Sequence, residues 1–119
     1  MRKKVMAAVL TAAMVASVSA MPQMVAAADD EFKIGLITDV GGVNDGSFNQ
    51  SAWEGLEKAG EELGVEVNYL ESATDADYQP NMETFVDEDY DLIISVGYML
   101  ADATREAAEA NPDTKFAII

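Results

Sequence analysis

The sequence predicts an α/β fold in which a parallel sheet is built from βαβ repeats. Short apolar runs alternate with amphipathic segments over residues 32–119, which is the pattern of strands joined by crossover helices. One run, Leu92 to Val96, is almost continuously apolar, as expected of a strand buried on both faces. The loop after the first run is rich in glycine and polar residues. Loops in that position bind ligands in open α/β sheets.

The first 28 residues have the features of a secretory signal peptide. Basic residues at positions 2–4 precede an apolar stretch from Val5 to Ala20, and alanines follow at 26–28. A membrane-spanning helix would need about 20 apolar residues, so we expect cleavage before Asp29. An earlier cut after Ala20 is the alternative. Residues 29–119 are therefore expected to lie outside the cytoplasm, in the periplasm or secreted.

Charge and composition narrow the function classes. The 119-residue chain has 22 acidic and seven basic residues and a net charge of −15. Removing residues 1–28 takes away three basic residues and no acidic ones, so the remaining chain is even more acidic. Repulsion between this negative charge and the phosphate backbone argues against nucleic acid as a partner. The chain contains no cysteine and no histidine, which excludes disulfides, the usual zinc ligands and a Ser-His-Asp triad. We predict no metal site, no cofactor and no catalytic residue.

The first βαβ unit is predicted from residue 32 to residue 70. A strand over Phe32–Thr38 is followed by a helix that begins at Ser47, where Ser47 and Gln50 have the spacing of a capping box. Gly64 is expected to end this helix, and a second strand follows over Val65–Leu70. The helix has apolar residues at helical spacing, namely Phe48, Ala52, Leu56, Ala59 and Leu63.

The remaining elements follow the same alternation. Asp75 or Asp77 is expected to cap a second helix with Pro80 near its start. Its apolar edge comprises Met82, Phe85 and Val86. A third strand over residues 92–96, a third helix over about 99–109 and a fourth strand over 115–119 complete the pattern.

The chain ends inside the apolar run Lys115 to Ile119. A buried strand of a doubly wound sheet is normally followed by another loop and helix. We therefore expect residues 29–119 to be part of a longer protein. A complete, small α/β domain is the alternative, since about 90 residues can fold with a modest core.

The candidate binding site lies between Thr38 and Gln50. Asp39, at the expected strand end, can accept hydrogen bonds from ligand hydroxyls, and Phe48 can stack on a flat ring. Structural alternatives stay open for both: Asp39 as a brace of the loop, and Phe48 as the first core residue of its helix. Asp45 and Ser47 are alternatively no more than helix caps.

Three segments resemble the basic membrane protein family of solute-binding proteins. They are IGLITDVGGVNDGSFNQSAWEGL at residues 34–56, YDLIISVGY at 90–98 and NPDTKFAII at 111–119. The resemblance implies that residues 29–119 form the first part of the N-terminal lobe of a type I periplasmic-binding-protein fold. It further implies an ABC importer receptor that captures purine nucleosides between two lobes and delivers them to a membrane permease.

The same resemblance implies roles for individual residues. Asp39 is expected to bind the ribose and Phe48 to stack on the base, while Ser47 and Asn49 line the same mouth. Many family members carry a lipid on a cysteine after the signal peptide. Met21 stands at that place here, so no covalent lipid anchor is expected.

Two other function classes compete with transport. A sensory receptor of the same fold would share every residue of this chain. A hydrolase could use Asp39 and Asp45 as paired carboxylates, but no nucleophile and base or metal cluster accompanies them. The protein is therefore predicted to be a binding protein and not an enzyme.

Overall fold

The computed structural model describes residues 31–119. The signal peptide expected at residues 1–28 lies outside this part of the chain. Four strands form one parallel sheet in the order β2-β1-β3-β4: β1 (Lys33–Ile37), β2 (Glu66–Leu70), β3 (Leu92–Ser95) and β4 (Lys115–Ile118). The predicted α/β class is confirmed, and each predicted strand is present, shorter by one residue at one or both ends.

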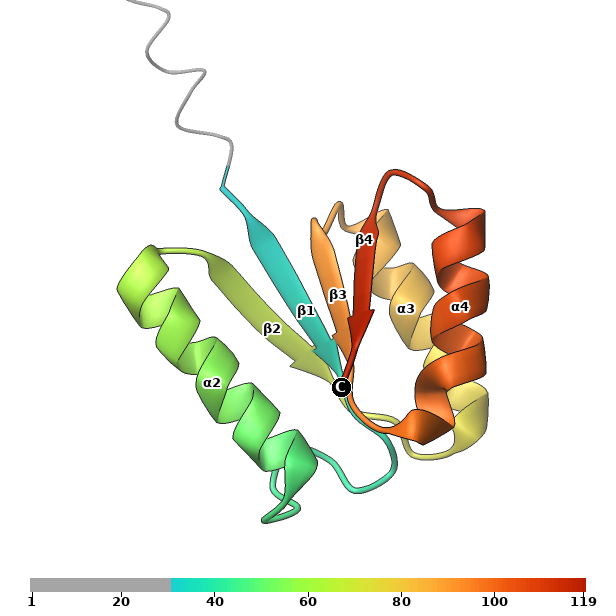
Figure 1. Cartoon of the computed structure of the whole chain (residues 1–119), viewed down its shortest axis with the longest axis horizontal. Helices are drawn as coiled ribbons and strands as arrows, with labels where there is room; N and C mark the ends of the chain where they lie inside the picture. Colours follow the sequence, from blue (N-terminus) through green and yellow to red (C-terminus); the bar gives the residue numbers. More distant parts are fainter. Residues whose placement is uncertain (1–30) are drawn as a thin grey trace, which may run out of the picture. The chain divides into compact units, whose positions relative to one another are not determined.

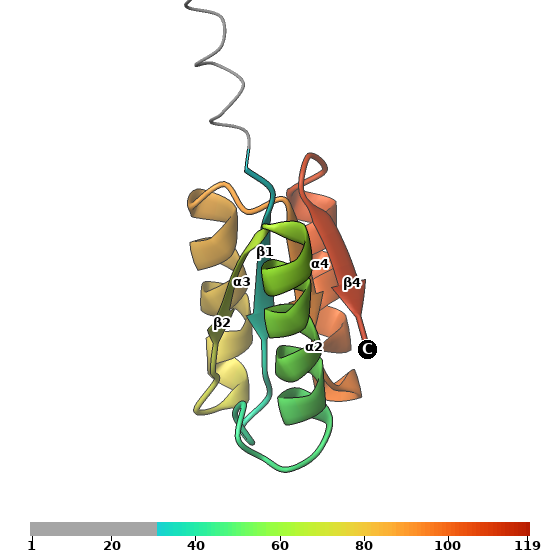
Figure 2. The same cartoon turned by 90° about the vertical axis from the view of Figure 1, so that its left-hand side faces the viewer.

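The helices cover both faces of the sheet. Helix α2 (Phe48–Leu63) joins β1 to β2, α3 (Tyr78–Asp87) joins β2 to β3, and α4 (Ala101–Ala110) joins β3 to β4. Short 3₁₀ turns, η1 (Asp75–Asp77) and η2 (Tyr98–Leu100), precede α3 and α4. Figure 1 shows α2 on one face of the sheet and α3 and α4 on the other. In Figure 2, α2 lies in front of the sheet, so the described residues form three layers.

A separate apolar cluster fills the space on each side of the sheet. Leu36 of β1 belongs to the cluster under α2, together with Val43, Leu56 and Val96. The next residue, Ile37, belongs to the larger cluster under α3 and α4. Leu36 and Ile37 are 1% and 0% exposed, because successive strand residues point to opposite faces. Both faces are buried, which is why the strands are nearly continuous apolar runs.

Helix α2 is longer than the strands that it covers. Its 16 residues extend about 24 Å at the usual helical rise, whereas a five-residue strand spans about 17 Å. The prediction that Gly64 ends the helix is correct, since Gly64 adopts a left-handed conformation with φ of 74°. The predicted apolar stripe is wrong at its two ends: Phe48 is 76% exposed and Leu63 is 74% exposed. The two residues are the first and the last of α2.

The expected caps of α3 belong to the turn before it. The Thr74 hydroxyl accepts a hydrogen bond from the amide of Ala76, and the Asp77 carboxylate accepts one from the amide of Thr74. Asp77 also accepts a hydrogen bond from the amide of Ala73 at 2.8 Å. This capping box stabilises η1, and the Asp77 side chain makes no capping bond to α3. Asp77 occupies the N-cap position of α3, as predicted, but its side chain caps η1 and not α3.

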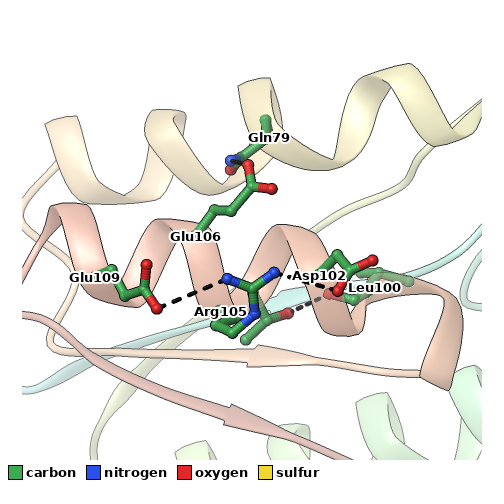
Figure 3. Close-up of polar contacts among 7 residues, drawn as sticks. Gln79, Leu100, Asp102, Arg105, Glu106 and Glu109 are labelled. Carbon is green, nitrogen blue, oxygen red and sulfur yellow. Dashed lines mark hydrogen bonds and ion pairs between the residues drawn. The ribbon is translucent and has the colours of Figure 1, made fainter.

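Polar contacts on the outer surface of α3 and α4 add to their apolar packing. Gln79 Nε2 of α3 donates to Glu106 Oε2 of α4 at 3.2 Å, and Arg105 lies between Asp102 and Glu109 (Figure 3). The two ion pairs are exposed, so each contributes only about 0.3–0.5 kcal/mol. The apolar cluster therefore accounts for most of the stability of this layer. None of the helices within residues 31–119 is long and apolar enough to span a bilayer.

Gly35 of β1 provides a test of the packing under α3. A Cβ at Gly35 would lie 2.6 Å from the ring of Phe85, which is only 2% exposed. Because the buried ring has little room to move, Gly35→Ala is expected to lower the free energy of unfolding by about 1–3 kcal/mol. Urea titration measures this change.

Gly55→Ala is the matched control. Gly55 is an exposed residue of α2, and a Cβ there meets nothing within 4 Å. Alanine is expected to raise stability at this helical position by about 0.5–1 kcal/mol. Equal changes for the two variants would contradict the close approach of β1 and α3.

Candidate functional site

The candidate site lies at the carboxyl edge of the sheet, between β1 and β3. Strand β2 pairs with one edge of β1, whereas β3 and β4 lie beyond the other. The connection after β1 therefore leads to α2 on one face, and the connection after β3 leads to α4 on the opposite face (Figure 1). Open α/β sheets bind ligands where two such connections diverge.

The two oxygen atoms of Asp39 have different surroundings. Oδ1 accepts a hydrogen bond from the amide of Gly41 and one from Nδ2 of Asn49, both at 2.8 Å. Oδ2 accepts none from the described residues, and a Cβ built on Gly97 would lie 3.5 Å from it. Oδ1 therefore braces the loop, and Oδ2 is free to accept a hydrogen bond from a ligand. The bracing role considered for Asp39 is thus seen at Oδ1, and a binding role would fall to Oδ2.

Asn49 lies beneath the loop. It is 2% exposed, and its side-chain amide holds Asp39 while its own Oδ1 has no partner among residues 31–119. The orientation of the amide follows from this bond, since the reverse orientation would place two oxygens against each other. Asn49 thus fixes the position of the Asp39 carboxylate from inside the protein.

The predicted capping box at Ser47 is not formed. Ser47 occupies the N-cap position of α2, but its side chain makes no capping hydrogen bond. Asp45 caps the helix instead: its carboxylate accepts from the amides of Ser47, Asn49 and Gln50 at 2.8, 3.2 and 3.0 Å. Gln50 Oε1 accepts from the amide of Gly46. A carboxylate that accepts three backbone donors replaces the hydroxyl cap expected from the spacing.

These hydrogen bonds change the acidity of Asp45. Burial alone would raise the pKa of Asp45, but hydrogen bonds from the amides of Gln50, Ser47 and Asn49 outweigh it, so the pKa lies below its ordinary value. Asp45 consequently carries its charge under all but strongly acidic conditions. The cap stays intact over the same range.

A second brace links the loop to the segment after β2. Glu71 Oε2 accepts a hydrogen bond from the amide of Val43 at 2.8 Å. Gly42, with φ of 71°, allows this approach, because a Cβ on Gly42 would lie 2.6 Å from the same oxygen. The missing side chain of Gly42 therefore makes room for a side chain of the protein itself.

A hollow of about 350 Å³ opens above Asp39. It is lined by Asp39, Phe48, Gly97, Tyr98 and Ile119, and we call it the Asp39 hollow. Phe48 and Tyr98 are 76% and 86% exposed, so neither ring belongs to a core cluster. The core alternative for Phe48 is therefore wrong. Asp39 and Phe48 meet in the hollow, whereas Ser47 and Asn49 do not line it.

Sequence reasoning missed the part of the hollow that follows β3. Gly97 has φ of 107° and starts the turn η2, which carries Tyr98. The sequence did contain a signal for this part of the site, because the carboxyl ends of neighbouring parallel strands meet at one edge of the sheet. A glycine and an exposed aromatic directly after a buried strand could have been paired with Asp39 on that basis.

The site is suited to binding. It offers one free carboxylate oxygen, two exposed aromatic rings and backbone atoms in a partly apolar hollow. Among residues 31–119, no group of three or more histidine, cysteine, aspartate or glutamate side chains could hold a metal ion. Aromatic rings beside a few convergent polar groups are typical of small-molecule sites.

Comparison with known proteins gives the family. Residues 32–119 match the family model Bmp, described as "ABC transporter substrate-binding protein PnrA-like". The chain belongs to this family. The match confirms the resemblance to basic membrane proteins that the sequence motifs indicated, and it defines a family of substrate-binding proteins.

Individual relatives agree with the family match. The chain is 49% identical over 94 residues to the CD4+ T-cell-stimulating antigen of Listeria monocytogenes, covering 75% of this chain and 26% of the relative. It is 41% identical over 93 residues to the ABC transporter nucleoside-binding protein BmpA of Lactococcus lactis, again covering 75% of this chain and 26% of the relative. The chain spans about a quarter of the length of these two relatives.

A solved structure from the same functional class has a similar fold. The crystal structure of ABC transporter system solute-binding proteins from Aeropyrum pernix is similar with a TM-score of 0.67 and 32% identity. The similarity covers 73% of this chain and 24% of that chain. The fold is therefore that of part of a solute-binding protein.

Some names of relatives bear on lipid attachment. Relatives from three Pyrococcus species are named uncharacterized lipoproteins. These names do not support the expectation that the protein lacks a covalent lipid anchor. That expectation rests only on the sequence, which contains no cysteine.

The lowered pKa of Asp45 predicts how stability changes with pH. A carboxyl whose pKa is lower in the folded than in the unfolded state adds stability above the unfolded pKa, and this contribution is lost as the pH falls through the folded pKa. Asp45→Asn is expected to lower the melting temperature at pH 7. The difference from the parent protein should shrink below about pH 4, the unfolded value of aspartate.

Thermal unfolding at pH 7, 5, 4 and 3 measures this effect. Asp113→Asn, in the exposed turn before β4, is the matched control and should leave the melting temperature at pH 7 unchanged. A deficit of Asp45→Asn that is the same at every pH would show that the charge of the cap is not what stabilises α2.

Proposed function

We propose that this chain belongs to an extracytoplasmic solute-binding protein that captures purine nucleosides and delivers them to the permease of an ABC importer. In this proposal residues 1–28 direct export, and residues 29–119 form part of the N-terminal lobe. A second lobe closes over the ligand. Asp39 and Phe48 contact the ligand, and Asn49 acts through Asp39.

The observation that carries the proposal is the free oxygen of Asp39 beside two exposed aromatic rings. Oδ2 has no donor among the described residues, and it shares the Asp39 hollow with Phe48 and Tyr98. A nucleoside combines the two matching groups, since its ribose hydroxyls donate hydrogen bonds and its base presents a flat face. Bonds to a charged acceptor are stronger than bonds to a neutral one, and aromatic faces favour flat rings.

The size of the hollow supports a two-lobed receptor. Its volume of about 350 Å³ is at the lower limit of the roughly 300–1,000 Å³ typical of ligand pockets. The hollow is also bordered by two exposed apolar side chains, Phe48 and Tyr98. One lobe therefore supplies only part of the surroundings of a nucleoside. The name of the Lactococcus lactis relative, a nucleoside-binding protein, supports this ligand class.

A substitution at Asp39 tests the proposed ribose contact. Asp39→Asn can keep the oxygen that Gly41 and Asn49 hold, while it replaces the free acceptor by a donor amide. In the full-length protein we expect nucleoside affinity to fall by about 1.5–3 kcal/mol, or roughly 10- to 100-fold. Binding of the free purine base should change much less. Isothermal titration calorimetry with adenosine, guanosine and their bases measures both.

Two outcomes would contradict this assignment. Equal losses for nucleoside and base would remove the ribose contact. Tight nucleoside binding by residues 29–119 alone would contradict the need for a second lobe.

A substitution at Phe48 tests the proposed stacking. Because Phe48 is 76% exposed, Phe48→Leu should leave the melting temperature unchanged and weaken nucleoside binding by about 0.5–1.5 kcal/mol through the lost aromatic contact. Met99→Leu is the control, since Met99 is 48% exposed beside Tyr98 but does not line the hollow. It should keep the parent affinity. Unchanged affinity of Phe48→Leu would refute the stacking role.

A further inference from the structure

A buried tyrosine hydroxyl has no hydrogen-bond partner among the described residues. Tyr78, the first residue of α3, is 4% exposed, and its hydroxyl oxygen makes no hydrogen bond to any of residues 31–119. Leaving a buried hydroxyl unpaired destabilises a protein. Such groups are uncommon in folded proteins, and each calls for an explanation.

The Tyr78 side chain shares an apolar cluster with residues that adjoin both connections of the Asp39 hollow. It belongs to the same apolar cluster as Ile37 and Leu100. Ile37 ends β1 two residues before Asp39, and Leu100 ends the turn that carries Tyr98. Burial raises the pKa of the Tyr78 hydroxyl, and the charges of Asp39 and Asp75 raise it further. Both effects favour the protonated hydroxyl, which is the form that can donate a hydrogen bond.

Counting hydrogen bonds at Asp39 leaves room for one more donor. A carboxylate offers about four acceptor positions, two on each oxygen. The amides of Gly41 and Asn49 take both positions on Oδ1. Oδ2 has two positions and no donor from the described residues. A ribose hydroxyl would take one position, and the other is free.

We propose that Tyr78 is a positioning residue of the nucleoside site, whose hydroxyl donates to Oδ2 of Asp39 when the ligand is bound. This inference rests on the proposed function. Hydrogen bonds in binding sites are often long before the ligand arrives and tighten in the complex. The ligand and Tyr78 then both donate hydrogen bonds to Oδ2, as Gly41 and Asn49 both donate to Oδ1. The unpaired hydroxyl is thus matched to the bound state and not to the fold alone.

Tyr78→Phe removes only the hydroxyl and tests this role against a purely structural one. Without ligand, the melting temperature of the full-length variant should stay the same or rise, since an unpaired buried polar group is removed. Its affinity for adenosine should fall about three- to tenfold, the loss expected for one hydrogen bond. Thermal unfolding and calorimetry measure the two quantities on one sample.

Tyr90→Phe is the matched control. Tyr90 is 5% exposed in the same apolar cluster, and its hydroxyl accepts from Asn68 Nδ2 at 2.7 Å and donates to Glu66 Oε2 at 3.3 Å. Removal of the Tyr90 hydroxyl should lower the melting temperature and leave the affinity for adenosine unchanged. Asp75→Asn should also leave the affinity unchanged, since Asp75 lies on η1 and does not line the hollow.

A double variant makes the test specific for Asp39. In the Asp39→Asn background, Tyr78→Phe should cause no further loss of affinity, because the two residues act on one contact. Additive losses would overturn the inference. A melting temperature of Tyr78→Phe as low as that of Tyr90→Phe would also overturn it, since the hydroxyl would then be bonded without ligand.

The outcomes separate this inference from the proposed function. Parent affinity in Tyr78→Phe, with nucleoside binding intact in the parent protein, would refute the role of Tyr78 alone. Failure of the parent protein to bind any nucleoside would overturn the proposed function and this inference with it.

Discussion

The candidate site depends on the central strand β1, which is paired along both edges and buried on both faces. Leu36 and Ile37 each bury a large side chain, which stabilises the fold by about 1.5–3 kcal/mol per residue. Backbone bonds continue past the end of the strand: the amide of Thr38 donates to Leu70, and the amide of Val96 donates to Ile37. Asp39 therefore starts from a fixed backbone, although it belongs to a loop.

The loop uses its own side chains to keep one oxygen atom available. Asn49 and the amide of Gly41 hold Oδ1 of Asp39, and Glu71 and Asp45 hold the loop at Val43 and at the start of α2. Gly97 completes the arrangement from the neighbouring strand, because it has no Cβ to cover Oδ2. An acceptor fixed before binding loses little freedom when a ligand arrives, and such preorganisation favours affinity.

Most of the fold could be predicted from the sequence, because the parallel sheet repeats one local pattern. Hydrophobic periodicity located the four strands, and Gly64 located the end of α2 through its need for positive φ. The wrong predictions concern features that depend on the tertiary structure and not on the local sequence. The exposure of Phe48 and Leu63 depends on the length of α2 relative to the sheet, and the cap at Asp45 depends on the path of the loop, which Ser47 and Gln50 do not specify.

The same distinction applies to the site. Asp39 and Phe48 could be identified because they lie in one conspicuous loop, and the sequence resemblance gave them roles. Tyr98 and Tyr78 lie 59 and 39 positions after Asp39 in the numbering, and only the strand order brings their segments to the same edge of the sheet. Spacing along the chain gives no indication that these segments meet.

The cap of α2 has a consequence for the kinds of ligand that the site can accept. The start of a helix ordinarily attracts phosphate groups, because its free amides and its dipole favour negative charge. Here the amides of Ser47, Asn49 and Gln50 are already bonded to the Asp45 carboxylate. A nucleotide would meet a negative charge at this helix end in place of free donors. Under the proposed function, this cap would disfavour phosphorylated compounds and favour their neutral, dephosphorylated forms.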